Sequence, residues 1–330
     1  MKLGRSGHRP IALVLAALSV FALPTSRAAA QSDYPNRTVR LVVGFAAGGG
    51  NDIFARLVAD KASQILGQSV IVENKPGAGG RLAPEYVLQQ PADGYTLFVG
   101  PSGAMAVAAA IYNDVKYSPT KDFVPLAMIA NFPLIMVIGA DNPSKNLKDF
   151  IEWMKQHPDK ANYASSSPAF TITTELLKLK SGMPGTMIPY KSSQEMNLSV
   201  IQGQSAMTIA DGPPTIPQVK GGKVKALAVT GKERSGELPD VPSMAEAGYP
   251  AVDVHLWSGI FAPSATPPAI VAKLQKAFAE AIADPGVSQK LKAMAVNPGG
   301  ATPEQFKQII ASDVTKFGDV VKAANLKFED

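Results

Sequence analysis

Val39-Arg40-Leu41-Val42-Val43 is a β-rich run that ends in the glycine-rich turn Gly44-Phe45-Ala46-Ala47-Gly48-Gly49-Gly50. From Asp52 to Leu66 apolar residues recur at helical spacing, so the turn leads directly into a predicted helix. Two more β-rich runs follow at 70–72 and 95–99, with a second helical stretch between them. This β-α-β-α-β order predicts an α/β fold with a mostly parallel sheet that helices cover on both faces.

A second unit of the same kind follows. The apolar run 126–138 is long enough to cross from one lobe to another, and the extended run 252–261 leads back. Between them, helices are predicted at 146–156, 171–181 and 193–202, alternating with short strands near 162–164, 187–188, 206–209 and 224–229. Three helices should follow residue 261, with Thr266-Pro267 and Thr302-Pro303 as start signals and Gln305 completing a capping box. The sequence thus predicts two lobes with a ligand cleft between them: 31–131 and 255–330 form lobe 1, and 132–254 form lobe 2.

Composition excludes several classes of function. The chain has 330 residues, 46% of them apolar, and it contains no Cys and three His. A disulfide framework and a cysteine nucleophile are therefore impossible, and neither a metal site nor a cofactor is predicted. The net charge is +5, but four of the 32 basic residues lie in the first thirty positions, which leaves 28 basic against 27 acidic groups. So nearly neutral a chain is not expected to bind nucleic acid.

The first thirty residues have the pattern of a secretion signal. Lys2 to Arg9 form a basic region, residues 11–23 form an apolar run, and Ala28-Ala29-Ala30 offers a cleavage site before Gln31. The alternative is an uncleaved membrane anchor, but thirteen residues are fewer than the ~20 that span a bilayer. We therefore expect residues 1–30 to be removed and the protein to be exported, to the periplasm in a Gram-negative cell.

Small residues follow several predicted strands. The loop 44–52 could present backbone N–H groups to an anion at the start of a helix, although its glycines could equally serve only a tight turn. Gly100-Pro101-Ser102-Gly103 ends the third strand, and Ser165-Ser166-Ser167 occupies the equivalent place in the second lobe, where an ordinary helix-entry loop is the alternative. Together the three loops favour a binding cleft at the carboxyl edges of the sheets.

Catalysis is poorly supported. The chain has no Gly-x-Ser-x-Gly elbow, and no pair of acidic residues has a spacing that marks a general acid and base. His157 precedes Pro158 in a polar stretch, where a solvated helix end is expected, and His255 lies beside Trp257 in an apolar strand, where a packed histidine is expected. The sequence does not predict an enzyme.

Motifs along the whole chain resemble one family. They are Tyr34-Pro35, the loop 44–52, 72–80 (Val-Glu-Asn-Lys-Pro-Gly-Ala-Gly-Gly), 91–97, Asn162 to Ser166, Pro189-Tyr190-Lys191 and 238–248. In this order they resemble the Bug-type extracytoplasmic receptors of tripartite tricarboxylate transporters. The resemblance implies a two-lobed periplasmic-binding-protein-like fold that closes on a small organic acid and delivers it to membrane transporter subunits. We expect a monomer.

The resemblance also implies a set of binding residues. The first-strand loop and the third-strand loop would hold one carboxylate through backbone amides and bridging waters, and the second lobe would supply the facing wall. The residues are Phe45, Ala46, Gly48, Gly49, Asp52, Pro101, Ser102 and Gly103 on the first side, and Ser165, Ser166, Ser167, Tyr190, Lys191 and Asp211 on the other. To these we add Phe170, which lies outside the family pattern, as a predicted ligand contact.

One departure from the family bears on the ligand. Ser167-Pro168-Ala169-Phe170-Thr171 replaces a longer glycine-rich stretch with a His, and Ser192 replaces the usual Gly after Tyr-Lys. Phe170 offers an apolar stacking face, so we expect a carboxylate with an apolar body, either aromatic or a medium-length dicarboxylate, rather than citrate. The alternative is that Phe170 turns inward to pack its own helix. A sensor that signals to a membrane partner without transport also remains open.

Overall fold

The computed structural model describes Met1, Gly4, residues 33–112 and residues 114–323. The chain divides into two compact units, Met1–Tyr34 and Pro35–Asp330, and every element below belongs to the second. The predicted signal segment, including the cleavage site after Ala30, lies outside the described residues apart from Met1 and Gly4. Within the described residues, no helix combines the length and the apolar character needed to cross a membrane.

The first lobe is built on a six-stranded sheet with the order β11-β4-β10-β3-β1-β2. Strand β1 runs parallel to β2 and β3, whereas β10 runs antiparallel to β3 and β4. The strands are β1 (Val39–Val43), β2 (Val70–Asn74), β3 (Thr96–Pro101), β4 (Phe123–Pro133), β10 (His255–Pro263) and β11 (Asn297–Pro298). The helical segments are α2 (Gly50–Leu66), η1 (Ala78–Gly80), α3 (Leu82–Leu88), η2 (Gly103–Val107), α4 (Ala108–Ile111), α9 (Pro268–Ala283), α10 (Pro285–Lys292) and α11 (Pro303–Ala323).

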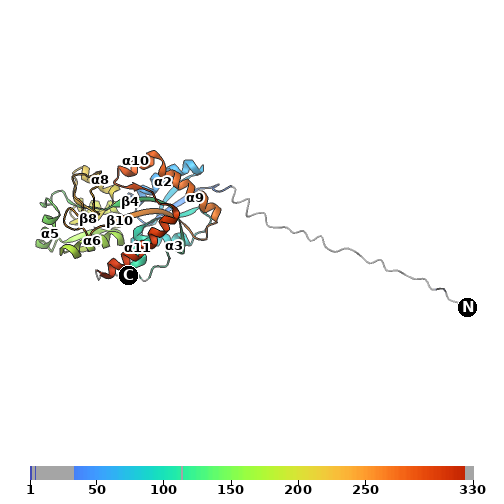
Figure 1. Ribbon diagram of the computed structural model, residues 1–330, viewed down its shortest axis with the longest axis horizontal. Helices are drawn as coiled ribbons and strands as arrows, with labels where there is room; N and C mark the ends of the chain where they lie inside the picture. Colours follow the sequence, from blue (N-terminus) through green and yellow to red (C-terminus); the bar gives the residue numbers. More distant parts are fainter. Residues whose placement is uncertain (2–3, 5–32, 113, 324–330) are drawn as a thin grey trace. The chain divides into compact units, whose positions relative to one another are not determined.

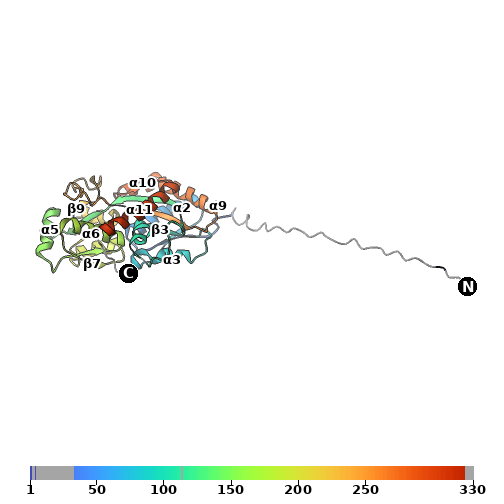
Figure 2. The same cartoon turned by 60° about the horizontal axis from the view of Figure 1, so that its bottom comes forward.

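The second lobe is built on a five-stranded sheet with the order β7-β6-β8-β5-β9. Its strands are β5 (Ile135–Gly139), β6 (Asn162–Ser165), β7 (Thr186–Pro189), β8 (Met207–Ala210) and β9 (Val224–Val229). Its helices are α5 (Leu147–Gln156), α6 (Pro168–Ser181), α7 (Ser193–Ile201) and α8 (Gly212–Lys220). Figure 1 shows α5, α6 and α8 around this sheet and α2, α3 and α9 around the first, and Figure 2 shows α5 and α6 beside β7 and β9, and α2, α3 and α9 beside β3, after rotation.

Both sheets are more mixed than the predicted parallel arrangement. The β-α-β units are parallel as expected, with β1 beside β2 and β3, and β6 beside β7 and β8. The exceptions are the short edge strand β11, which is antiparallel to β4, and the strands that carry the chain between lobes. Strand β4 leads out of the first sheet and β10 leads back into it, so the two run antiparallel. Strand β5 continues from β4 and enters the second sheet antiparallel to β8 and β9.

The two crossings meet at a buried threonine. The predicted run 126–138 is two strands, β4 and β5, because Leu134 leaves both ladders and bonds to Thr230 instead. The Leu134 N–H donates to Thr230 Oγ1 (2.8 Å), and the Thr230 N–H donates to the Leu134 carbonyl (2.8 Å). The Thr230 hydroxyl then donates to the Val254 carbonyl (2.6 Å) on the returning segment. Thr230 therefore ties the outgoing and returning chains together between the lobes.

The C-terminal helices return to the first sheet, where α9 and α11 both contact β4. The predicted capping box of α11 is confirmed, since the Gln305 N–H donates to Thr302 Oγ1 (3.2 Å) and the Thr302 N–H donates to Gln305 Oε1 (2.9 Å). The predicted start of α9 is wrong by one residue: the helix begins at Pro268 and Pro267 is its N-cap. A Pro-Pro pair offers two candidates for the first helical position, and the Thr266 N–H is used in a turn to Pro263.

Candidate ligand-binding site

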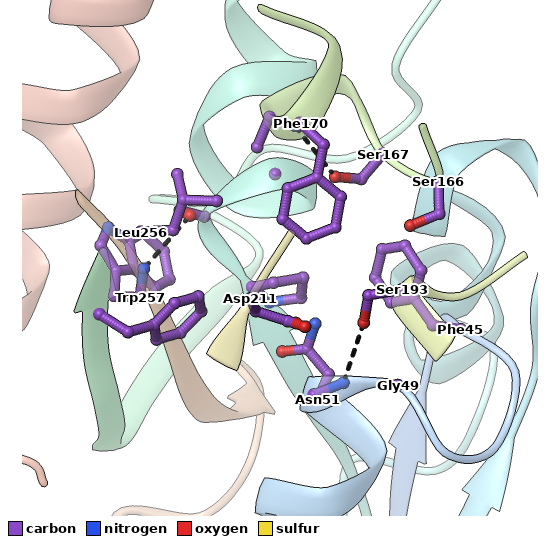
Figure 3. Close-up of a pocket in the computed structure, with 16 residues that line it drawn as sticks. Phe45, Gly49, Asn51, Ser166, Ser167, Phe170, Ser193, Asp211, Leu256 and Trp257 are labelled. Atoms are coloured by element: carbon purple, nitrogen blue, oxygen red, sulfur yellow. Dashed lines mark hydrogen bonds between the residues drawn. The ribbon is translucent and has the colours of Figure 1, made fainter. Parts of the chain in front are cut away.

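Loops from both sheets converge on one narrow cavity. Each follows the carboxyl end of a strand (β1, β3, β6, β7 or β8) and leads into a helical segment, and β4 and β10 close the remaining side (Figure 3). The cavity holds about 20 Å³, which is room for one or two water molecules and not for an organic acid. It is lined by Phe45, Gly49, Gly50, Asn51, Pro101, Ser102, Gly103, Phe132, Ser166, Ser167, Ala169, Phe170, Ser193, Asp211, Leu256 and Trp257.

Asp52 braces the first-strand loop. This carboxylate is buried and accepts hydrogen bonds from the Gly48 N–H (2.9 Å), Asn74 Nδ2 (2.9 Å) and Arg56 Nε (3.0 Å). Burial opposes its ionisation, but the bonds from Arg56, Gly48 and Asn74 outweigh burial and hold the pKa of Asp52 below its ordinary value. Asn74 Nδ2 also donates to the Phe45 carbonyl (3.0 Å), so both ends of the loop are fixed from β2.

The same loop touches the second lobe directly. The Ala46 N–H donates to the Lys191 carbonyl (3.1 Å), and the Gly50 N–H donates to Ser193 Oγ (3.4 Å). Two glycines permit this approach: a Cβ on Gly48, whose φ is +84°, would overlap Gln194, and a Cβ on Gly50 would overlap Asp211. The lobes are therefore in contact across the cleft, which is closed in this structure.

Strand β10 supports the third-strand loop. Ser102 Oγ accepts from the Trp257 N–H (3.3 Å), which joins this loop to the crossing strand. The Trp257 indole N–H donates to Asp313 Oδ2 (2.7 Å), and its ring packs edge-on against Phe306 with centroids 4.9 Å apart. Because both partners belong to α11, the C-terminal helix fixes one wall of the cavity.

The three serines after β6 have different roles. Ser165 Oγ lies 2.8 Å from Thr171 Oγ1, and Ser167 Oγ accepts from the Phe170 N–H at 3.5 Å as the N-cap of α6. The Ser166 hydroxyl is buried, lines the cavity and has no hydrogen-bond partner. Of the three, Ser166 is thus the one whose hydroxyl remains to bind a ligand.

Apolar side chains form much of the wall. Phe170 is buried and lines the cavity, so its ring belongs to the site as well as to the packing of α6 (Figure 3). Phe45, Phe132, Leu256 and Trp257 line it too. These five side chains give the cavity wall a largely apolar surface.

Asp211 is the one ionisable side chain in the lining. It is 1% exposed and precedes α8, and its carboxylate accepts from the Ser193 side chain and from the Gly50 N–H at the start of α2. Its Oδ1 atom is buried with no partner. Burial raises the pKa of Asp211 to about 6, although the bonds from Ser193, its own amide and Gly50 oppose that rise.

Nine of the fifteen predicted site residues line the cavity, and six do not. The six outside it are Ala46, Gly48, Asp52, Ser165, Tyr190 and Lys191. Ala46, Gly48 and Lys191 use backbone groups to shape or join the loops, and the Tyr190 hydroxyl lies 3.4 Å from Ser205 Oγ. Direct ligand contact by any of the fifteen stays a prediction.

Sequence reasoning missed seven lining residues: Gly50, Asn51, Phe132, Ala169, Ser193, Leu256 and Trp257. Ser193 could have been found, because it begins α7 just after the predicted Tyr190-Lys191 segment. The crossing-strand residues carried no such signal, since an apolar residue in a strand looks like ordinary core.

Among the described residues, no group of three His, Cys, Asp or Glu side chains is placed to hold a metal ion.

Comparisons with known proteins agree with this fold. The family model described as "Tripartite tricarboxylate transporter family receptor" matches residues 54–326. The chain is 32% identical to protein BugT of Bordetella pertussis over 321 residues, 96% of this chain and 98% of BugT. It is similar to MatC of Rhodopseudomonas palustris with bound malate (32% identity, TM-score 0.84, 87% of this chain and 100% of that one).

A further R. palustris protein, Rpa4515 with adipate, has 33% identity and a TM-score of 0.85 over 89% of this chain and 99% of its own. The sequence motifs, the two-lobed fold and these matches all indicate the same family. The chain belongs to the receptors of the tripartite tricarboxylate transporter family, which are periplasmic solute-binding proteins rather than enzymes.

Proposed function

We propose that this protein captures an organic carboxylate in the periplasm and delivers it to the membrane subunits of a tripartite tricarboxylate-type transporter. The main support for the proposal is that helices begin at a cavity whose lining contains no Lys or Arg. Helices α2 and α8 both begin at this cavity, directly after Gly49 and Asp211, so the positive dipole ends of both helices point toward the cleft. Helix dipoles and backbone amides would therefore hold the carboxylate.

The lobes would open and close about the two crossings. Lobe 1 would comprise 31–131 and 255–330, and lobe 2 would comprise 132–254, with Leu134 and Thr230 at the junction. Because the closed cavity admits one or two waters, a ligand has to enter an open form and be enclosed when the lobes approach.

The lining favours a ligand with an apolar body. Five large apolar side chains line the cavity, and the lining contains no Lys or Arg that could compensate the third carboxylate of citrate. Each desolvated aromatic contact contributes on the order of 1 kcal/mol. We therefore infer a dicarboxylate of medium length or an aromatic acid such as terephthalate. Malate in MatC and adipate in Rpa4515 show that similar proteins hold small dicarboxylates.

A thermal-shift screen of the exported chain against organic acids tests the binding, because a ligand that binds only the folded state raises the melting temperature. Titration calorimetry with terephthalate, adipate and citrate then tests the size and charge of the ligand. Tightest binding by citrate would contradict the inferred class. Deletion of the gene should abolish uptake of the bound acid; loss of gene induction with normal uptake would indicate a sensor instead.

A further inference from the structure

The Asp211 carboxylate lines the cavity, where a bound ligand would contact it. The carboxylate lies between the lobes, with Oδ2 against the α carbon of Gly50 and Oδ1 buried without a partner. Figure 3 shows it in the middle of the lining residues, between Phe170 of the second lobe and Asn51 of the first. A buried acceptor without a donor destabilises the folded protein, and more so when the acceptor is charged.

The lining residues offer this oxygen no cationic donor. They include no Lys, Arg or His, and Asn51 adds a second buried oxygen, Oδ1, that also has no partner. The unpartnered Ser166 hydroxyl can donate one bond, and a carboxylate ligand competes for it. A ligand that brings only carboxylate oxygens would thus place more negative charge beside acceptors that already lack donors.

We propose that Asp211 selects a carboxylate that also carries a hydroxyl or ammonium group, which donates to Oδ1 of Asp211 when the cleft closes. The inference rests on the proposed function and narrows it to hydroxy or amino acids of the inferred size. At pH 8, above its pKa of about 6, Asp211 is ionised and can only accept a hydrogen bond. A site built around a buried acceptor rejects analogues that lack the matching donor.

Two ligand series with fixed carbon skeletons measure this selection by titration calorimetry at pH 8. One is succinate, malate and aspartate; the other is adipate, 2-hydroxyadipate and 2-aminoadipate. Within the series that fits the cavity, the hydroxy or amino member should bind at least tenfold more tightly than the member without a donor, which is the scale of one hydrogen bond to a charged group. Comparison within a series cancels the effect of chain length.

Three variants test whether Oδ1 of Asp211 is the atom that causes the preference for a ligand with a hydrogen-bond donor. Asp211→Ala removes the acceptor and should abolish the preference for either donor. Asp211→Asn keeps an oxygen but removes the charge, so a preference for the hydroxy acid should survive and a preference for the amino acid should collapse. Ser166→Ala is the matched control: it removes another unpartnered group of the cavity, and should weaken all members of a series alike. Circular dichroism and thermal melts confirm that each variant is folded.

The outcomes separate this inference from the proposed function. If no carboxylate binds, the proposed function fails. If carboxylates bind but the donor-free members bind as tightly as their hydroxy and amino partners, the role of Asp211 is refuted and the receptor function stands. A preference that persists in folded Asp211→Ala would also refute it, because the donor would then be recognised elsewhere.

Discussion

The two walls of the cleft are built differently. The first wall, the first-strand loop 44–50, is rich in glycine and meets the cleft largely through backbone, and Asp52 and Asn74 fix it from behind. The second-lobe wall is mainly side chains, and two of them, Ser166 and Asp211, present buried polar atoms without partners. A backbone wall recognises a carboxylate whatever the rest of the molecule is, whereas side chains can differ between relatives. The first wall thus suits a general grip, and the second suits selection among acids.

The acidic residues behind and within these walls should respond to pH in opposite ways, and Asp211 should show the larger effect. Its pKa is 3.8 in the unfolded chain and about 6 in the folded one, so the folded protein binds more protons between these values. The free energy of unfolding should therefore fall as pH rises from about 4 to 7, by up to about 3 kcal/mol.

The side chain of Asp211→Asn cannot titrate, so the free energy of unfolding of this variant should not decrease over that pH range. Urea unfolding at several pH values would measure the difference. Asp240→Asn, at an exposed acid of the same lobe, is the control and should keep the decrease. A pH profile of Asp211→Asn that matches the unsubstituted protein would show that the two walls do not differ in this respect.

Gly50→Ala tests whether the first wall needs a bare backbone. The added Cβ would overlap the Asp211 carboxylate and hold the lobes apart. We expect ligand affinity to fall about thirtyfold, or about 2 kcal/mol, within the range that overpacking costs. Gly236→Ala serves as the control, because a Cβ there meets open space. Unchanged affinity of the folded Gly50→Ala protein would mean that the walls need not meet so closely.

Asp52→Asn tests the brace behind the first wall. Loss of the charged hydrogen bonds to Gly48 and Arg56 should lower the free energy of unfolding by about 1–2 kcal/mol at pH 7. Because the pKa of Asp52 is lowered, this contribution is present above pH ~4 and is lost as pH falls through the lowered pKa, so the stabilities of the two proteins should converge on acidification.

The control for the brace is Asp93→Asn in the exposed Arg37–Asp93 pair, where about 0.5 kcal/mol or less is expected. If Asp52→Asn cost no more than Asp93→Asn in urea unfolding at pH 7, the first loop would not depend on its brace.

Phe170→Leu tests the second wall, and its expected effect on affinity is the smallest. Leucine keeps apolar volume but loses the stacking face, so affinity for terephthalate should fall about threefold relative to adipate. Titration of both acids against both proteins gives this ratio directly. An unaltered ratio would place the stacking surface elsewhere in the cavity, among Phe45, Phe132 and Trp257.

The sequence predicted where the binding loops lie better than which other residues contact them. The Gly44–Gly50 turn and the serine run could be placed because small residues after a strand and before a helix mark a carboxyl edge. The bonding of Asp52 to Asn74 could not, since it depends on how β1 pairs with β2. Leu256 and Trp257 were missed for the same reason: their position depends on the antiparallel register of β10 against β4.

The direct contacts between the lobes have a kinetic consequence. The Ala46–Lys191 and Gly50–Ser193 hydrogen bonds hold together a cleft that contains no ligand-sized space. Association therefore has to wait for these bonds to break. In stopped-flow mixing, the observed rate constant should rise with ligand concentration and then level off at the rate of opening, so that this receptor limits the speed of capture by its own motion and not by diffusion.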